Sequence, residues 1–297
     1  MEFTFKTAKE LLALCKKNKK SIADITKLFE MESSGRSNAF VRNKMKTTRD
    51  VMREAIDRGI KSKEKSKMGM VGGDAKKLYD QLGSLRNMMG NKVCIRAMAY
   101  ATAVGEQNAC MRKIVAFPTA GGSGVVPGVL FSASEHFHAG KRRLLRGFFT
   151  ASAVGLIIAE GATLSAAAGG CQAEVGAAVA MAAAGLTEMR GGTAEQCINA
   201  SAMSLKSYLG LVCDPLGGLV EVPCIKRNAL GCMVAIGASD MSMAGIESFI
   251  PFDEVVEAMN NIGKIMSPKL RETALGGLAV TETGNKIKRK LGLPIVQ

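Results

Sequence analysis

Three cysteines lie beside glycines and prolines, outside any clear helical pattern. Cys171 stands in GGCQAEVG, where a glycine-rich turn leads into a predicted helix, and Cys213 and Cys224, 11 positions apart, flank the loop DPLGGLVEVP. A helix N-terminus favours the thiolate, which is the form of cysteine that binds metal. A small buried apolar residue in a tight helix contact is the commoner role of an unpaired cysteine. The residues by themselves leave both interpretations open.

The spacing of the cysteines excludes the usual local metal motifs. No two cysteines are separated like those of zinc ribbons, and no close string of them resembles a ferredoxin. A three-cysteine site would therefore have to be assembled from distant segments. If three thiolates held a [4Fe-4S] cluster, one iron would lack a protein ligand and could accept a substrate hydroxyl or carboxylate.

A glycine-rich segment is the second candidate for chemistry. Its missing side chains let backbone N–H groups approach an anion such as a substrate carboxylate, and two hydroxyls lie among them. It has no Gly-Lys-Ser/Thr and no strand-led GxGxxG, so it is not a nucleotide-binding loop. A tight turn between helices explains the string equally well. The residues concerned are Thr119, Ala120, Gly121, Gly122, Ser123 and Gly124.

Other reactive side chains carry weaker signals. His136 and His138 are the only histidines and lie two positions apart, so they cannot share one helix face. We expect both to be structural or surface residues. The remaining cysteines fall within helical patterns and are expected to be core or incidental residues: Cys15, Cys94, Cys110, Cys197 and Cys232.

The elements that must position these residues are predicted to be helices. Tryptophan is absent, aromatic residues make up 5%, and Ala, Gly and Met supply much of the apolar content, which favours closely packed helices. With 297 residues, the chain can bury a large core. We predict an all-α protein with a single large helical domain over residues 1–297 and Gly/Pro-rich active-site loops.

Local signals divide the chain into segments. Ser21 with Asp24, and Thr193 with Gln196, resemble capping boxes at helix starts. Apolar residues recur at helical spacing from Phe40 to Ile60. Helices are also expected over residues 75–112, 143–160, 174–189 and 194–209, near Cys224 and after Ser267, with a polar connection over 61–73, a loop over 117–128 and irregular chain over 213–223.

Charge and composition limit the partners and the location. The net charge is +14, but the basic clusters mostly lack the interleaved aromatics of single-strand binders, so we expect no nucleic acid and a surface that faces solvent or an acidic partner subunit. Residues 114–134 contain prolines and glycines that would leave backbone groups unpaired in lipid, so we expect a buried loop region and no membrane association. Residues 1–20 lack the apolar stretch of a secretory signal, which predicts a cytoplasmic protein.

Taken together and in order, four strings resemble the signature segments of the iron-sulfur L-serine dehydratases. They are FPTAGGSGVVPG, GCQAEVGAAVAMAAAGL, CDPLGGLVEVPCIKRNA and LRETALGGLAV. The resemblance is close over residues 98–280, the predicted cluster and substrate region, whereas residues 1–73 are similar to the more variable, charged helical N-terminal part of the family. The chain looks like the separate large (alpha) subunit of the two-subunit form.

The resemblance implies a cofactor, a substrate and a partner. Cys171, Cys213 and Cys224 would hold a [4Fe-4S] cluster whose open iron takes the hydroxyl of L-serine, and residues 119–124 would line the serine site. Serine would lose water and then ammonia to give pyruvate. The base would be a histidine of a small (beta) subunit, so the catalytic base of this chain stays unknown and a hetero-oligomer is expected.

Two other functions fit the same residues. A cysteine desulfidase-like lyase of the same superfamily is the first, because sulfide also leaves readily from iron. The second is a non-enzymatic iron-sulfur redox sensor, whose positive surface would contact DNA or a partner. Turnover of serine against cysteine separates the first alternative, and a serine-induced change in the cluster spectrum separates the second.

Overall fold

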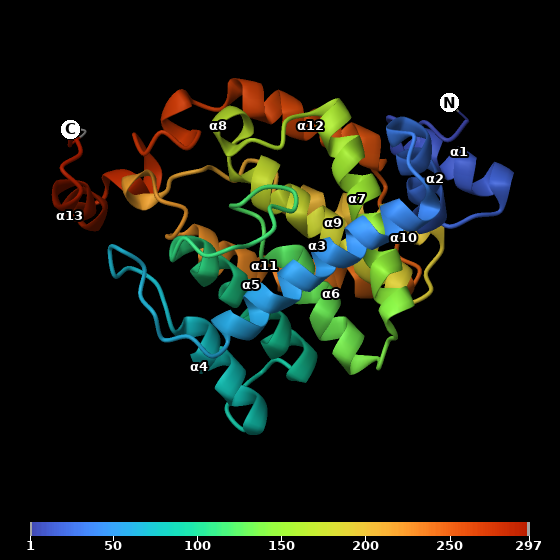
Figure 1. Ribbon diagram of the computed structural model, residues 1–297. Helices are drawn as coiled ribbons and strands as arrows, with labels where there is room; N and C mark the ends of the chain where they lie inside the picture. Colours follow the sequence, from blue (N-terminus) through green and yellow to red (C-terminus); the bar gives the residue numbers. More distant parts are fainter. Residues whose placement is uncertain (1, 296–297) are drawn as a thin grey trace.

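The computed structural model describes residues 2–295, so residue 1 and residues 296–297 of the predicted domain lie outside the described range (Figure 1). Over residues 2–295 there is no β-strand, only an isolated bridge between Cys213 and Arg271. The all-α prediction is confirmed. The α-helices are α1 Ala8–Asn18, α2 Ile22–Ser34, α3 Asn38–Gly59, α4 Asp74–Asp80, α5 Lys92–Ala109, α6 Val125–His136, α7 Lys141–Gly161, α8 Ala166–Gly169, α9 Ala177–Met189, α10 Ala194–Lys206, α11 Cys224–Met243, α12 Phe252–Ile265 and α13 Glu282–Lys290.

Helix starts follow the predicted capping residues. The Ser21 hydroxyl accepts a hydrogen bond from the Asp24 N–H at the start of α2. Thr193 and Gln196 form the complete capping box of α10. Side-chain caps satisfy N–H groups that the first helical turn leaves without a partner, which is why these signals can be read in sequence.

Two predicted boundaries were wrong. The pattern over residues 75–112 is divided between α4 and α5, because the chain turns at Gly83 and Gly90 and Asn91 caps a new helix. The loop predicted over 117–128 ends early, since α6 begins at Val125 and includes Pro127. Proline is tolerated there because a residue in the first turn needs no intrahelical N–H partner. Residues 125–133 are thus buried helix, not buried loop.

Later segments differ less from expectation. The helix expected from Glu174 starts as a π-helix, Gln172–Gly176, before α9 begins. Ser267 caps only the short 3₁₀ turn Pro268–Leu270. Irregular chain over 213–223 and a helix from Cys224 are confirmed. α12 lies where no helix was predicted.

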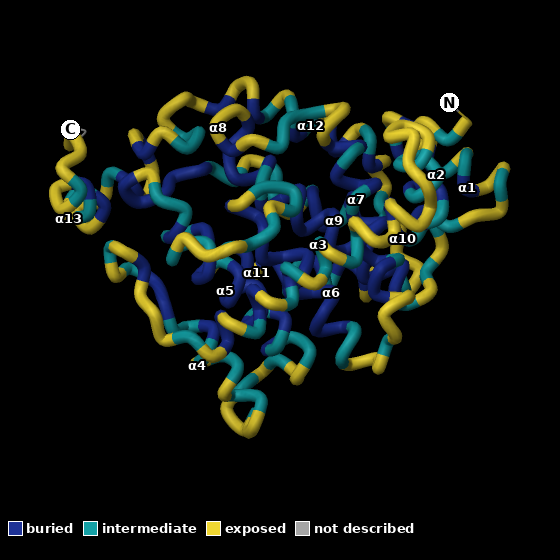
Figure 2. Tube along the Cα trace, viewed as in Figure 1, coloured by how far each residue is buried: buried dark blue, intermediate teal, exposed yellow. Residues whose placement is uncertain are grey.

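α9 forms the centre of the molecule. All of its residues are buried, and it packs against α6, α7, α10 and α11. A continuous cluster of buried apolar side chains extends from Phe5 in the N-terminal segment to Met259 in α12. Figure 2 shows this buried interior enclosed by exposed turns and outer helix faces. Because α9 consists mainly of alanine and glycine, its neighbours can approach closely and fix its two ends.

Close contact between α7 and α9 depends on paired glycines. A Cβ atom on Gly185 would lie 2.7 Å from the Gly147 carbonyl oxygen, and one on Gly147 would lie 2.8 Å from the Met189 Cγ atom. These distances are below van der Waals contact, so any larger residue would push the two helices apart.

α7 is long and apolar enough to cross a membrane by length and composition, although no span was expected from the sequence because of charges such as Arg146 and Glu160. Within the fold, 67% of its most apolar stretch is buried. It packs against α2 and α9. Burial among these helices accounts for its apolar composition.

Candidate functional site

Cys171 lies where the chain enters the π-helix. Gly170, with φ of 76°, turns the chain, and Cys171 follows with 1% of its surface exposed. A Cβ atom at Gly170 would lie 2.7 Å from the Met266 sulfur and 2.9 Å from the Leu211 carbonyl oxygen. Glycine is therefore required here both by the left-handed backbone and by the close approach. π-Helical turns occur frequently at functional sites.

Cys213 is brought beside this turn by backbone and amide hydrogen bonds. The Gln172 N–H donates to the Leu211 carbonyl at 3.1 Å, and the Gly210 N–H donates to the Gln172 side chain at 2.9 Å. On its other side, the Cys213 N–H donates to Leu270 at 2.8 Å, and its carbonyl accepts from Glu272 at 2.9 Å. Cys213 is 2% exposed. The segment is thus held between the π-helix and residues 270–272.

Cys224 is the first residue of α11 and is also buried. The loop before it is closed by a hydrogen bond from the Leu216 N–H to the Val222 carbonyl at 3.0 Å. Gly217 and Gly218 have φ of 62° and 74°, conformations that favour glycine and reverse the chain. The structure therefore gathers the three predicted cysteines from separate segments into one buried region.

The thiols of this region affect one another's pKa values. The Cys213 thiol and the Arg227 guanidinium are the close neighbours of Cys171 that influence its pKa. The pKa of Cys171 is lowered by the Cys213 thiol and by the charge of Arg227, which together outweigh burial. The Cys171 thiol and its charge, together with burial, raise the pKa of Cys213. Burial, followed by the charges of Cys171 and Glu174, raises the pKa of Cys224 to about 12. Cys171 is thus the first of the three thiols to ionise.

Arg227 connects the cysteines electrostatically and structurally. Its guanidinium donates to the Val212 carbonyl at 2.9 Å and to the Asp214 carboxylate at 3.0 Å, on either side of Cys213. The Asp214 side chain is only 5% exposed, so its charge depends on this partner. The sequence reasoning missed Arg227. Its position, three residues after Cys224 on the same helix, could have indicated it, since residues three apart share a helix face.

Three buried cysteines are the ligand type that iron-sulfur clusters use. Within residues 2–295, no three His, Cys, Asp or Glu side chains are grouped closely enough to hold one ion. A tetrahedral zinc site requires sulfurs about 2.3 Å from one metal, whereas a cluster binds its thiolates through different iron atoms. Arg271 is paired with Cys213 through the backbone bridge, and its buried Nε has no hydrogen-bond partner among residues 2–295, as expected beside an anionic group that would accept its hydrogen bond.

The glycine-rich segment packs against this region and leads into α6. Three of its six N–H groups are already used: Gly122 donates to the Thr119 hydroxyl at 3.4 Å, Ser123 to the Ala120 carbonyl at 3.3 Å and Gly124 to the Asn228 side-chain oxygen at 3.0 Å. The Ser123 hydroxyl donates back to Ala120 at 2.7 Å. Anion binding would therefore depend on the N–H groups of Thr119, Ala120 and Gly121, which are fewer than the sequence suggested.

Asn228 fastens the glycine-rich segment to the cysteines. Its side-chain amide donates to the Gly121 carbonyl at 2.6 Å and to the Cys224 carbonyl at 2.9 Å. Its oxygen accepts the Gly124 N–H. The residue is 3% exposed. Like Arg227, it was missed by sequence reasoning, and its position four residues after Cys224 is the signal that could have found it.

Glu174 is the carboxylate of this site. Its carboxylate lies near the Thr119 side chain, and a Cβ atom on Gly121 would lie 2.3 Å from its Oε2 atom. Burial raises the pKa of Glu174 despite the nearby Thr119 side chain. A residue other than glycine at 121 would displace the carboxylate, so the glycine string serves in part to admit Glu174.

The two histidines lie away from this region. His136 and His138 are exposed at the C-terminal end of α6, whose N-terminal end follows the glycine-rich segment. The 12 residues of α6 separate the two ends by about 18 Å. As predicted, neither histidine is placed to act at the cysteine site.

The sequence matches known proteins over nearly its full length. The family model described as serine dehydratase alpha chain matches residues 16–279. A probable L-serine dehydratase alpha chain from Bacillus subtilis (strain 168) is 45% identical over 97% of this chain and 95% of its own length. The L-serine dehydratase alpha chain of Peptoniphilus asaccharolyticus is 42% identical over 95% of this chain and 97% of its own.

Longer relatives share the same region. The L-serine dehydratase of Helicobacter pylori (strain ATCC 700392 / 26695) is 38% identical over 94% of this chain, and the match covers 62% of that protein. The family match includes Cys171, Cys213, Cys224, Arg227 and Asn228 within its bounds. The resemblance first seen in four strings therefore extends over residues 16–279, and the chain belongs to the serine dehydratase alpha-chain family.

Proposed function

We propose that this chain is the alpha subunit of an L-serine dehydratase, which converts L-serine to pyruvate and ammonia. The observation that carries the proposal is the meeting of Cys171, Cys213 and Cys224 in one buried region, beside the glycine-rich segment, in a chain of this family. The full-length alpha chains named above support the same activity.

We propose a [4Fe-4S] cluster as the cofactor, held by the three cysteines. When bound through three thiolates, such a cluster supplies an iron without a protein ligand, which is a Lewis acid for a substrate hydroxyl. The neighbouring Cys213 and Arg227 lower the pKa of Cys171 and so favour its thiolate, and the thiols would lose their remaining protons as metal binds. The partnerless Arg271 Nε adds a hydrogen-bond donor near Cys213.

The residues around the cysteines suit a zwitterionic amino acid. We propose that the N–H groups of Ala120 and Gly121 receive the serine carboxylate, as part of a substrate site lined by residues 119–124. The Glu174 carboxylate, near Thr119, would accept a hydrogen bond from the ammonium group, whose positive charge would favour the ionised carboxylate. Asn228 bonds to the carbonyls of Gly121 and Cys224 and so fixes the glycine-rich segment relative to Cys224. The chain thereby binds and orients the substrate.

We propose that a small (beta) subunit completes the active site in the cytoplasm. The relatives of equal length are named alpha chains, which implies a second chain in those proteins. The histidines of this chain lie at the far end of α6, so the base that removes the Cα proton would come from the partner. A complementary acidic surface on the partner would be attracted by the net charge of +14.

Reconstitution tests the proposal. The chain is purified anaerobically, iron and sulfide are measured, and pyruvate formation from L-serine is followed with and without the small subunit. We expect cluster binding by the chain alone and an increase in activity of about 10²- to 10⁴-fold with the partner, since a general base contributes that much. Full activity of the isolated chain would overturn the divided site.

Two further measurements address the other functions. Faster turnover of cysteine than of serine would replace dehydratase activity by desulfidase activity. A cluster spectrum unchanged by saturating L-serine, in the presence of the partner, would favour a sensor and contradict a substrate-binding iron.

A further inference from the structure

A basic surface pocket lies at the opposite end of α9 from the cysteines. It has a volume of about 340 Å³, near the lower end of the ~300–1,000 Å³ typical of small-molecule sites. Three helices form it: α2, the first turns of α3 and the first half of α7. Its lining residues are Asp24, Lys27, Asn38, Arg42, Arg142, Leu145, Arg146 and Phe149. We call it the α2–α3–α7 pocket.

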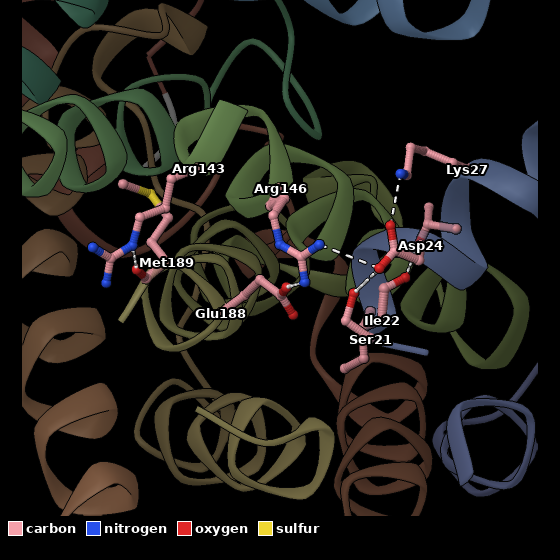
Figure 3. Close-up of polar contacts among 9 residues, drawn as sticks. Ser21, Ile22, Asp24, Lys27, Arg143, Arg146, Glu188 and Met189 are labelled. Carbon is pink, nitrogen blue, oxygen red and sulfur yellow. Dashed lines mark hydrogen bonds and ion pairs between the residues drawn. The ribbon is translucent and has the colours of Figure 1, made fainter. Parts of the chain in front are cut away.

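Part of its charge is internally balanced. Asp24 accepts from Lys27 at 2.7 Å and from Arg146 at 3.2 Å, and Arg146 also binds Glu188 of α9 at 2.6 Å. Figure 3 shows Arg146 between the two carboxylates, with Lys27 and Ser21 directed at Asp24. The Glu188 side chain is 4% exposed. These two cations and two carboxylates cancel and give the pocket a rigid wall.

The remaining charge is not balanced. Arg42 and Arg142 line the pocket, and within residues 2–295 neither forms an ion pair or a side-chain hydrogen bond with the protein. The pocket therefore presents two uncompensated guanidinium groups. Its floor includes Leu145 and Phe149, 6% and 3% exposed, which limits solvent screening on that side. Guanidinium groups suit phosphate and carboxylate because they can donate two parallel hydrogen bonds.

We propose that the α2–α3–α7 pocket binds a small organic dianion, with Arg42 and Arg142 neutralising its two charges. The volume admits a molecule larger than a simple inorganic ion, and the uncompensated charge equals that of a phosphate monoester or a dicarboxylate. The site is separate from the cysteines. Glu188, the ion-pair partner of Arg146, is 17 residues beyond Cys171. At the rise of an α-helix this corresponds to roughly 25 Å.

Calorimetry on the anaerobically prepared chain tests the proposal, with glycerol 2-phosphate, succinate and acetate as probes at constant ionic strength. We expect one saturable site for a dianion and at least about tenfold weaker binding of monoanionic acetate, because a second charge-assisted contact is lost. The two dianions distinguish a phosphate-selective from a carboxylate-selective site. Acetate binding as tightly as either dianion would overturn the proposal.

Paired substitutions localise the site. In Arg42→Gln/Arg142→Gln, the Kd should rise tenfold or more, whereas Arg86→Gln/Arg289→Gln removes two exposed, unpaired arginines elsewhere and should leave the Kd unchanged. Circular dichroism and unfolding without ligand confirm that both variants fold. Equal weakening in both pairs would show general screening and overturn the site. The proposal would also be overturned if the unsubstituted chain bound no dianion and Arg42→Gln/Arg142→Gln lost binding of the small subunit. That result would identify the pocket as a protein-docking surface.

Discussion

The two ends of α9 are built in different ways. At its N-terminal end, the backbone is irregular: a π-helix, left-handed Gly170 and the isolated bridge at Cys213 bring together thiols and a carboxylate. At its C-terminal end, regular helices place Glu188, Arg146 and Asp24 in a chain of ion pairs. The first end gathers buried thiols whose protonation depends on their neighbours. The second end pairs Asp24, Arg146 and Glu188 and leaves Arg42 and Arg142 without ion pairs among residues 2–295.

The difference shows that irregular backbone is concentrated at the end of α9 that carries the candidate functional site. Backbone in sparsely populated conformations is costly and concentrates at functional sites. Next to Cys213, Glu272 and Ala274 both have φ near 60°, although neither is glycine. In α2 and in the first half of α7, no residue has such a φ. Substitutions at the first end should therefore change function most, while substitutions at the second end should change stability by a smaller amount and leave cluster binding intact.

The largest effect is expected at the cysteines. Cys171→Ala, Cys213→Ala and Cys224→Ala should each weaken cluster binding by at least about a hundredfold, because a thiolate ligand is lost. Iron and sulfide analysis after anaerobic purification measures this. Cys197→Ala and Cys232→Ala are the matched controls, since both residues are fully buried core cysteines outside the site. Normal iron content in Cys213→Ala would contradict the ligand assignment.

The glycine-rich segment should be next. A Cβ atom on Gly122 would lie 2.8 Å from the Glu174 carbonyl oxygen and 3.1 Å from the Ala178 Cβ atom, so Gly122→Val must displace the segment. We expect serine turnover with the small subunit to fall about 10²-fold while the iron content stays normal. Gly140→Val is the control, because nothing lies within 4 Å of its Cβ position. Unchanged kinetics in Gly122→Val would leave this segment as a structural turn.

Arg227 tests whether the cysteine end depends on a buried charge. Arg227→Gln would leave the Asp214 carboxylate buried without its partner, which costs about 3–5 kcal/mol of unfolding free energy. It would also remove the charge that lowers the pKa of Cys171, so cluster assembly should slow at neutral pH and recover as the pH rises. Urea unfolding and the rate of cluster reconstitution at several pH values measure the two effects. Arg227→Lys, which keeps the charge, should recover the assembly rate more than the stability.

Asp24 should give the smallest effect. Burial would raise its pKa, but the hydrogen bonds from Lys27 and Ser21 and the charges of Lys27 and Arg146 lower the pKa to about 2. Because the folded-state pKa lies below the unfolded one, this carboxylate stabilises the fold above about pH 4, and the stabilisation is lost as the pH falls toward 2.

Asp24→Asn should therefore lower the unfolding free energy by about 1 kcal/mol at pH 6, a value reduced for the partial exposure of the side chain. The difference from the unsubstituted chain should shrink below pH 4 in urea titrations. Asp50→Asn is a control with a more exposed carboxylate. A difference that stays constant down to pH 3 would show that Asp24 acts through packing and not through charge.

The sequence by itself determined the helical class and several helix starts, and it predicted which cysteines would bind a cofactor. Capping depends on residues within one turn, and apolar spacing depends on one helix face, so Ser21, Thr193 and the pattern of α3 could be read locally. The three cysteines were selected by the family resemblance of the strings around them, because their spacing alone left their role open.

Only the tertiary structure decided which groups act together. Cys171 meets Cys213 through hydrogen bonds between Gln172 and residues 210–211, and no periodicity predicts such contacts across distant segments. Cys213 and Arg227 lower the pKa of Cys171. Asn228 accepts the Gly124 N–H, so that this N–H group cannot bind an anion. Burial and electrostatics arise from the packed arrangement of the whole chain, whereas residue type and spacing specify only its local elements.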